Sequence, residues 1–329
     1  MSQTLKKWIN RCGRIPPREF WSTLIFFLYY AWKQAGHAAR RFRGGGDVES
    51  HINLKRTHYL EKAILCDTGR DAELDRICAD LKAYLAGPKG PEDDCYLYMM
   101  KMVNEYEGYP TGFSCYMREI PFKPHSAVEA KAVRRIIVQR RSIRLFSQSP
   151  VSKAELGKIA EAGSFAPTSC NAQPLMFLSL TDRAVVRQVF EAASGAKGWA
   201  HTVPSAIVVA SDRRHYKPFE QHLIMFQDIA AGIQNCLLMC EALNLAACWV
   251  SLISDSHIKN ETSVCASLGL PEYYAVGGAI AIGYPMNTVC HVPRRPLAKT
   301  WHHEKFAPVA GSGAGAGSIA TLSQPDDRD

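Results

Sequence analysis

Apolar side chains recur at two different spacings along this chain. In the first part they return every three or four residues, as at Leu74, Cys78 and Leu81, which is the period of a helix with one buried face. Later, helical stretches alternate with short apolar runs that are typical of buried strands. The predicted helices are 56–65, 71–85, 93–106, 127–141, 152–162, 182–193 and 228–245, and the predicted strands are 175–180, 204–211, 247–251 and 276–284. The pattern therefore predicts an α+β fold preceded by a helical extension.

Composition and glycine-rich breaks suggest how the chain is divided. Its 329 residues, 47% of them hydrophobic, suffice for a large core and leave room for about two domains. Three glycines at 44–46 indicate a linker, and the Gly- and Ser-rich end of the chain is typical of a disordered tail. We predict a basic, aromatic N-terminal arm over 1–50, a helical extension over 51–125, an α+β domain over 126–305 and a disordered tail over 306–329.

The net charge of +8 is concentrated in the N-terminal arm, because residues 1–60 carry eleven Lys and Arg against three acidic residues. Within the arm, residues 21–32 are strongly apolar and aromatic. This run is shorter than the roughly 20 residues of a membrane span, and no cleavage site for a secretory signal follows it. Two interpretations stay open: a helix that packs on the protein or its dimer mate, and an interfacial helix that contacts anionic lipid. We predict no nucleic-acid binding, because no stacking platforms accompany the basic charge.

The cysteines and histidines indicate neither disulfides nor a metal site. Eleven cysteines, an odd number, occur without the pair spacing of a zinc site, which favours the reducing cytoplasm. Cys236 and Cys240 lie on one face of an apolar helix, where two small buried side chains are expected. The run His302-His303-Glu304 has no further ligand at a zinc spacing, so we predict no metal.

Candidate chemistry is concentrated between Arg140 and Pro174. Three arginines and a serine within five residues, 140–144, offer the charge-assisted and bidentate hydrogen bonds that a phosphate needs. One predicted helix later, residues 166–174 combine short polar side chains with two prolines, so that a rigid loop can direct amides and hydroxyls at a flat polar ring. The two stretches together predict a mononucleotide site.

These residues resemble the FMN-dependent nitroreductases, whose members carry an Arg-Arg-Ser-x-Arg-like motif followed by a Pro-Ser-x-x-Asn-x-Gln-Pro loop. In this chain Thr168 replaces the serine and keeps the hydroxyl. Residues 247–251 resemble the Gly-Thr-Cys-Trp-Ile-Gly strand of the family, and 293–297 resemble its C-terminal basic pair. The resemblance covers 130–300, just over half of the chain. It implies a mixed central sheet wrapped by helices, and a homodimer with FMN bound between the protomers.

The resemblance also implies which residues contact FMN. Arg140, Arg141 and Ser142 would bind the ribityl phosphate, and Arg144 would place positive charge near the N1/C2-oxygen edge of the ring, where it stabilises reduced flavin. The other residues implied at the cofactor are Pro167, Thr168, Ser169, Asn171, Gln173, Lys197, Trp249, Val250, Ser251, Arg294 and Arg295. Three positions depart from the family pattern, namely Ser194, Ala196 and Ser251. No side chain is implied as a catalytic acid or base.

By the same resemblance, NADH or NADPH would reduce FMN, which would then reduce an organic acceptor of nitroaromatic or quinone type. The run from His58 to Lys62 resembles a His-x-Leu-Glu-Lys signature of relatives with a helical extension that are associated with exopolysaccharide biosynthesis. On chemistry alone, His58 and Glu61 form either an acid–base pair or a surface ion pair. Two alternative functions stay open: a flavin-fragmenting or dehalogenating relative, and a non-catalytic docking module with a degenerate flavin site.

Overall fold

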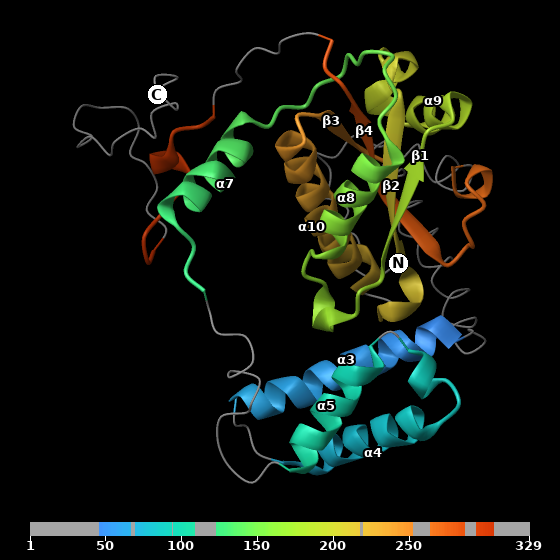
Figure 1. Ribbon diagram of the computed structural model, residues 1–329, viewed down its shortest axis with the longest axis vertical. Coiled ribbons are helices and arrows are strands. Elements are labelled where there is room, and N and C mark those ends of the chain that lie inside the picture. Colours follow the sequence, from blue (N-terminus) through green and yellow to red (C-terminus); the bar gives the residue numbers. More distant parts are fainter. Residues whose placement is uncertain are drawn as a thin grey trace, which may run out of the picture.

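The computed structural model describes residues 46–66, 70–93, 95–108, 123–217, 220–252, 264–286 and 294–305 (Figure 1). The aromatic run 21–32 of the predicted arm and the predicted tail from 306 lie outside these residues. The described chain forms a helical unit and, beyond it, a sheet with helices on both faces.

Four strands form the sheet in the order β1-β2-β4-β3. They are β1 (Leu175–Leu180), β2 (Ser205–Asp212), β3 (Ala246–Ser251) and β4 (Tyr274–Gly283). Each neighbouring pair is antiparallel, and the parallel pairing among the described residues is the single bridge between Ser142 and Ala247. All eight residues of β2 are buried, as expected for a central β-branched strand. The prediction of an α+β fold with four strands is confirmed.

Both faces of the sheet are covered. Alternate residues of β2 point into two cores, because successive side chains of a strand face opposite sides. On one face α9 (Arg183–Ala192) contributes Val186 and Phe190 to the core. On the other face α8 (Lys153–Ser164) and α10 (Glu220–Ala242) pack together over the sheet. Gly163 lets them approach, since a Cβ there would lie 2.6 Å from the Cys236 sulfur.

Helix α10 is longer at its start than the predicted 228–245 and ends earlier, at Ala242. Its residues Leu223–Ala242 form a helix long and apolar enough to cross a membrane, by length and composition alone. One face is buried against α8 and the sheet, through Ile229, Ile233 and Cys240. Ala230, Ala231 and Leu238 on other faces stay half-buried within one chain. The described part of one chain therefore covers fully only the core face of this helix.

Helix α7 (Ala127–Gln139) stands off the sheet and contacts the body through α10 (Figure 1). It begins at a capping box, in which the Ser126 hydroxyl accepts from the Glu129 amide and the Glu129 carboxylate accepts from the Ser126 amide. None of its residues is buried. Apolar side chains at helical spacing without a buried position indicate a face that the described part of one chain leaves uncovered.

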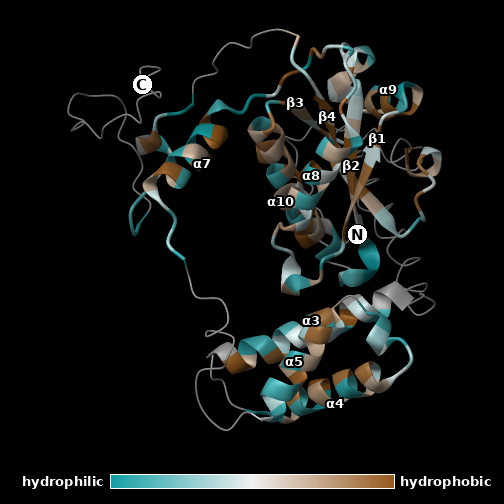
Figure 2. Cartoon of the chain, viewed as in Figure 1, coloured by the Kyte–Doolittle hydropathy of each residue, from teal (hydrophilic) through white to brown (hydrophobic). Residues whose placement is uncertain are grey.

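The helical extension is a unit with its own core. It consists of α3 (Gly46–Cys66), α4 (Ala72–Ala86) and α5 (Tyr96–Glu107), and α3 contacts both of the others. Brown apolar stretches of the three helices face one another in Figure 2, and Leu60, Leu81, Met99 and Tyr106 are buried between them. Helix α3 also touches the sheet domain at 169–171 and 213–215. The extension thus rests on the loop that was predicted to face a ring.

Candidate functional site

The basic segment 140–144 is fixed along the edge strand of the sheet. Ser142 forms its bridge with Ala247 of β3, and the Ile143 amide donates to the Ala247 carbonyl at 3.1 Å. The Thr202 hydroxyl donates to the Arg144 carbonyl at 3.1 Å. These backbone contacts hold the segment beside β3, so its side chains project from an ordered scaffold.

The three arginines of this segment have different surroundings. The Arg141 guanidinium donates to the carbonyls of Val138, Gln139 and Arg140 and therefore caps the end of α7. Arg140 is half-buried, whereas Arg144 is exposed and donates only weakly, at 3.4 Å, to the Ser142 carbonyl. Arg140 and Arg144 are thus better placed than Arg141 to bind an anion.

The positive charge of this segment reaches neighbouring groups. Burial raises the pKa of Cys248 on β3, while the charges of Arg144 and Arg140 and a hydrogen bond with Ser142 oppose that rise. Burial likewise raises the pKa of Glu241 near the end of α10, against the charges of Arg140 and Arg141. The edge of the sheet at the start of β3 is therefore an electropositive region suited to phosphate.

Strand β3 carries two predicted contact residues on its accessible side. The Trp249 side chain is 40% exposed, and Ser251 is also exposed, whereas Val250 between them points into the core. The Trp249 indole lies over Gly278, where a Cβ would be 2.5 Å from its Nε1. The short helix Ser194–Ala196 contacts β3, and Lys197 after it is exposed. An aromatic surface and a lysine therefore lie along the strand that the basic segment follows.

Ala196, one of the departures from the family pattern, is completely buried in the core beside Trp199, whose ring packs at 5.8 Å from that of Phe190. The position is therefore occupied by a core methyl group.

Replacing Ala196 with asparagine should destabilise the protein by about 2 to 4 kcal/mol, because the amide would be buried without prepared partners. Gly195→Asn is the matched control, since Gly195 is exposed and a Cβ there meets no atom within 4 Å. Urea denaturation measures both free energies of unfolding. Equal losses in the two variants would contradict the buried position of Ala196.

The loop 167–174 is strained. Cys170, Asn171 and Gln173 have positive φ values of 52°, 49° and 48°. Side chains other than glycine rarely adopt this left-handed region, at a cost of about 1–3 kcal/mol each, and such residues gather at functional sites. The Thr168 hydroxyl accepts from the Gln173 amide at 3.0 Å, and the Gln173 side-chain amide donates to Asn171 Oδ1 at 3.3 Å. The structure thus brings together Thr168, Asn171 and Gln173, with Ser169 and Pro167 in the same loop.

Within one chain this loop and the basic segment lie at opposite ends of α8. The Ser169 amide donates to Asp228, whereas Arg140 and Arg141 act on Glu241. Asp228 and Glu241 are 13 residues apart on α10, which corresponds to about 20 Å at a rise of about 1.5 Å per residue. Within one protomer the ring-facing loop and the phosphate-binding segment therefore lie near opposite ends of α10. Arg294 and Arg295, which the resemblance also implies at the cofactor, are both exposed.

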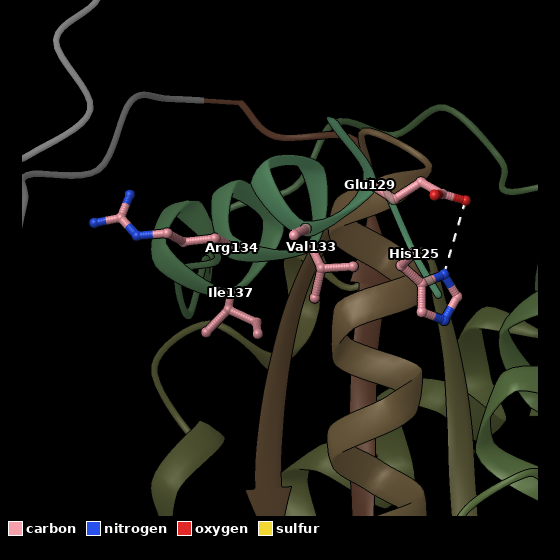
Figure 3. A pocket seen from close by; sticks show the side chains of 6 residues that line it. His125, Glu129, Val133, Arg134 and Ile137 are labelled. Carbon is pink, nitrogen blue, oxygen red and sulfur yellow. Dashed lines mark ion pairs between the residues drawn. The ribbon is translucent and has the colours of Figure 1, made fainter. Parts of the chain in front are cut away.

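A shallow apolar pocket of about 440 Å³ lies along α7 (Figure 3). It is lined by Ala130, Val133 and Ile137, with Glu129, Arg134 and His125 at its polar margin. Val133 and Ile137 are 56% and 52% exposed. Exposed apolar side chains gathered in a hollow indicate a contact surface rather than a stable solvent-facing helix.

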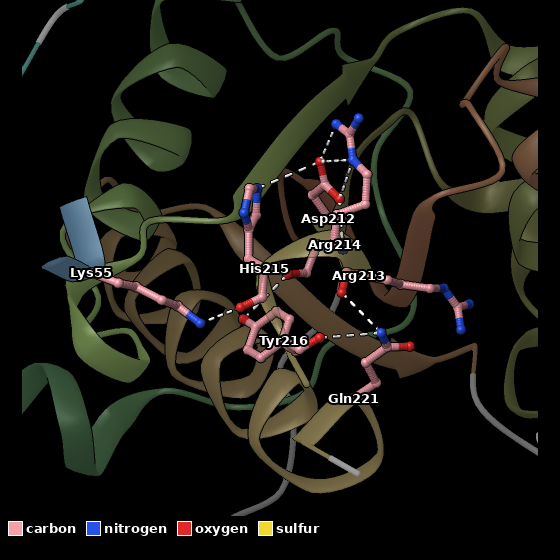
Figure 4. A network of polar contacts seen from close by, with 8 residues as sticks. Lys55, Asp212, Arg213, Arg214, His215, Tyr216 and Gln221 are labelled. Atoms are coloured by element: carbon pink, nitrogen blue, oxygen red, sulfur yellow. Dashed lines mark hydrogen bonds and ion pairs between the residues drawn. The ribbon is translucent and has the colours of Figure 1, made fainter. Parts of the chain in front are cut away.

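A buried polar cluster at residues 212–221 was not predicted (Figure 4). Asp212 accepts from the Arg214 guanidinium and lies 3.5 Å from His215 Nε2, and Arg214 stacks on Tyr273 with its Cζ 3.5 Å from the ring centre. Burial alone would raise the pKa of Asp212, but hydrogen bonds from His215 and Arg214 outweigh it and lower the pKa from 3.8 to about 2.

Because folding lowers this pKa, the charged Asp212 contributes stability above pH 3.8 that is lost as the pH falls to about 2. The contribution should be about 2 kcal/mol. We expect the difference in free energy of unfolding between the wild type and Asp212→Asn to shrink by that amount from about pH 5 to about pH 2. A difference that stays constant with pH would contradict the shift.

Comparisons with known proteins agree with this geometry. A sequence profile described as the Nitroreductase family matches residues 137–197 and 186–284, which include the basic segment, the strained loop and all four strands. The chain belongs to the nitroreductase family. The family accounts for α8 to β4, whereas α3, α4 and α5 precede the matched residues.

Individual nitroreductase relatives cover the same part. The chain is 26% identical to the oxygen-insensitive NADPH nitroreductase of Salmonella typhimurium, over 53% of this chain and 74% of that protein. It is 24% identical to an FMN reductase (NAD(P)H) of Bacillus subtilis, over 52% and 72% of the two chains. A solved structure from Desulfovibrio desulfuricans, described as a nitroreductase in complex with FMN, is 30% identical over 53% of this chain and 98% of that one, with a TM-score of 0.45.

Among the described residues of this nitroreductase, no group of three or more His, Cys, Asp and Glu is arranged to hold a metal ion. His58 and Glu61 of α3 form a partly buried hydrogen-bonded pair, with 2.9 Å between Nδ1 and Oε2. Sequence reasoning missed Asp228, whose only signal was an isolated acidic residue in an apolar helix.

Proposed function

We propose that this protein is an FMN-dependent oxidoreductase that uses NADH or NADPH to reduce an organic acceptor. The observation that carries the proposal is the fixed electropositive segment 140–144 beside the exposed Trp249, in a chain of the nitroreductase family. Relatives named as NADPH nitroreductase and FMN reductase support the same chemistry. Bound FMN would supply the two-electron redox chemistry, and the chain would supply binding, orientation and charge.

The residues fit this cofactor. Arg140 and Ser142 supply donors for a phosphate, Arg144 supplies positive charge for the N1/C2-oxygen edge of the ring, and Trp249 offers an aromatic surface for a flat ring. Asn171 and Gln173 supply amides that can donate and accept at the polar edge of a ring. We assign Arg141 a supporting part at the end of α7, and we propose that Lys197, Arg294 and Arg295 add positive charge. No side chain is assigned as an acid or base.

The proposal includes a homodimer whose two copies complete each site. Asp228, which accepts from the ring-facing loop, and Glu241, which lies in the field of Arg140 and Arg141, are about 20 Å apart along α10. On this proposal the second half of each site comes from the other copy. The uncovered face of α7 and the half-buried face of α10 are the surfaces that such a copy would cover. We place the protein in the cytoplasm, since its cysteines show no zinc or disulfide spacing.

The acceptor is proposed by class only, as a nitroaromatic or quinone-like compound in vitro. A physiological acceptor linked to polysaccharide biosynthesis, and contact of the N-terminal arm with a membrane, remain predictions from the sequence. The same holds for the alternatives, a flavin-fragmenting or dehalogenating enzyme and a non-catalytic docking module.

Equilibrium dialysis of the full chain against FMN tests the binding step. We expect stoichiometric uptake, one FMN per protomer, with micromolar or tighter affinity, and turnover of a quinone with NADH or NADPH. A protein that takes up no FMN would favour the docking module, and a protein that binds FMN but converts it to another product under air would favour a flavin-fragmenting enzyme.

A further inference from the structure

The start of the strained loop 167–174 is held by the buried carboxylate of Asp228. Both oxygens of Asp228 accept from the Ser169 amide at 3.1 Å, and one of them also accepts from the Tyr216 hydroxyl at 2.7 Å. Asp228 is only 7% exposed. A buried carboxylate that receives these donors fixes both the start of the loop and the tyrosine.

Helix α3 of the extension contacts Tyr216, the tyrosine that donates to Asp228, and its neighbour His215 (Figure 4). The Lys55 ammonium donates to the His215 carbonyl and lies 5.5 Å from the centre of the Tyr216 ring. One turn later, Tyr59 lies beside the strained loop, where the Cys170 thiol raises the pKa of Tyr59. A continuous set of contacts therefore runs from α3 through Tyr216 and Asp228 to Ser169.

We infer that Asp228 is a positioning residue that holds the ring-facing loop in its strained form, and that α3 stabilises this arrangement through Lys55 and Tyr59. The inference rests on the proposed function, because the loop matters for chemistry only if a flavin lies against it. Asp228 itself touches no proposed ligand. It acts through Ser169, which sets the start of the turn that carries Asn171 and Gln173.

The strain explains why such a tether is needed. Three residues at positive φ within four positions would relax to ordinary backbone angles if the loop were released. Relaxation would move the side chains of Asn171 and Gln173, whose mutual contact depends on those angles. Solvent-exposed residues of the loop cannot hold these backbone angles by themselves. The fixed carboxylate of Asp228 in the core provides that support.

The first experiment measures how readily the loop opens in protein without any cofactor. Cys170 is half-exposed in the loop, so its alkylation by iodoacetamide, followed by peptide mass mapping, reports loop opening. We expect Asp228→Asn to speed this alkylation about tenfold, because one charge-assisted acceptor is lost. Asp212→Asn is the matched control, an equally buried carboxylate whose partners are Arg214 and His215. It should leave the labelling of Cys170 unchanged.

The second experiment measures the flavin. We expect Asp228→Asn to weaken FMN binding about tenfold and to alter the visible spectrum of the bound flavin, while Asp212→Asn keeps both. Equal labelling of Cys170 in the wild type and Asp228→Asn would overturn the inference whatever the wild type binds. An opened loop with unchanged affinity and spectrum would also overturn it. A wild type that binds no FMN would instead refute the proposed function.

Discussion

FMN binding should weaken at least about 100-fold when Arg140 and Arg144 are both replaced by glutamine, because each substitution removes a charged donor worth about 1.5–3 kcal/mol. The segment that carries them is fixed by backbone contacts to β3 and by the Thr202 hydroxyl, so the fold should persist. The loss should appear as a higher dissociation constant in fluorescence titrations with FMN. It should be smaller with riboflavin, which lacks the phosphate that Arg140 would bind but keeps the ring that Arg144 would face.

The matched control removes the same charge elsewhere. Arg76 on α4 and Arg187 on α9 are exposed and lie outside the site, so Arg76→Gln/Arg187→Gln should bind FMN as the wild type does. If both double variants lost the same affinity, the effect would be one of net charge, and the assignment of a phosphate site to 140–144 would be wrong.

Introducing charge on the uncovered face of α7 should produce a monomer that no longer binds FMN. Val133→Asp/Ile137→Asp places two carboxylates in the apolar pocket, where a second copy would have to desolvate them. Helix α7 has no buried residue, so the protomer itself should stay folded. Sedimentation velocity measures the mass, and dialysis measures the FMN bound. We expect an affinity at least about 100-fold lower, because on our proposal one protomer holds only half of the site.

Val128→Asp is the control for that experiment. Val128 is 78% exposed on the same helix but lies about 140° from Val133 and about 180° from Ile137 around its axis, outside the pocket. It should keep both mass and cofactor. A monomeric double variant that still bound FMN like the wild type would contradict a site shared between two copies.

The spacing of apolar residues was sufficient to predict those strands whose position depends on burial alone. The strand 175–180 was predicted to the residue, and the fully buried β2 was predicted one residue early, because an apolar run between polar residues leaves one arrangement of lowest energy. Helix α10 begins at Glu220, earlier than predicted, where the Glu220 carboxylate accepts from the Lys217 amide. A local polar contact of this kind leaves little trace in hydrophobic spacing.

The site was only partly predictable for a different reason. Motifs showed which residues could bind a phosphate or a ring, but they gave no distance between the two stretches in the folded chain. Helix α8 instead carries the chain from one end of α10 to the other between the two motifs. The contact of Asp228 with Ser169 joins residues 59 positions apart, and no spacing rule in the sequence predicts it.

The central claim is tested most directly by anaerobic reduction of the FMN-loaded full chain, followed by its visible absorption. We predict that NADH or NADPH bleaches the flavin band and that a quinone added afterwards restores it, with one equivalent of acceptor consumed per flavin. A loaded protein whose absorption neither nicotinamide changes, although dithionite bleaches it, would contradict the assignment as an NAD(P)H-dependent oxidoreductase.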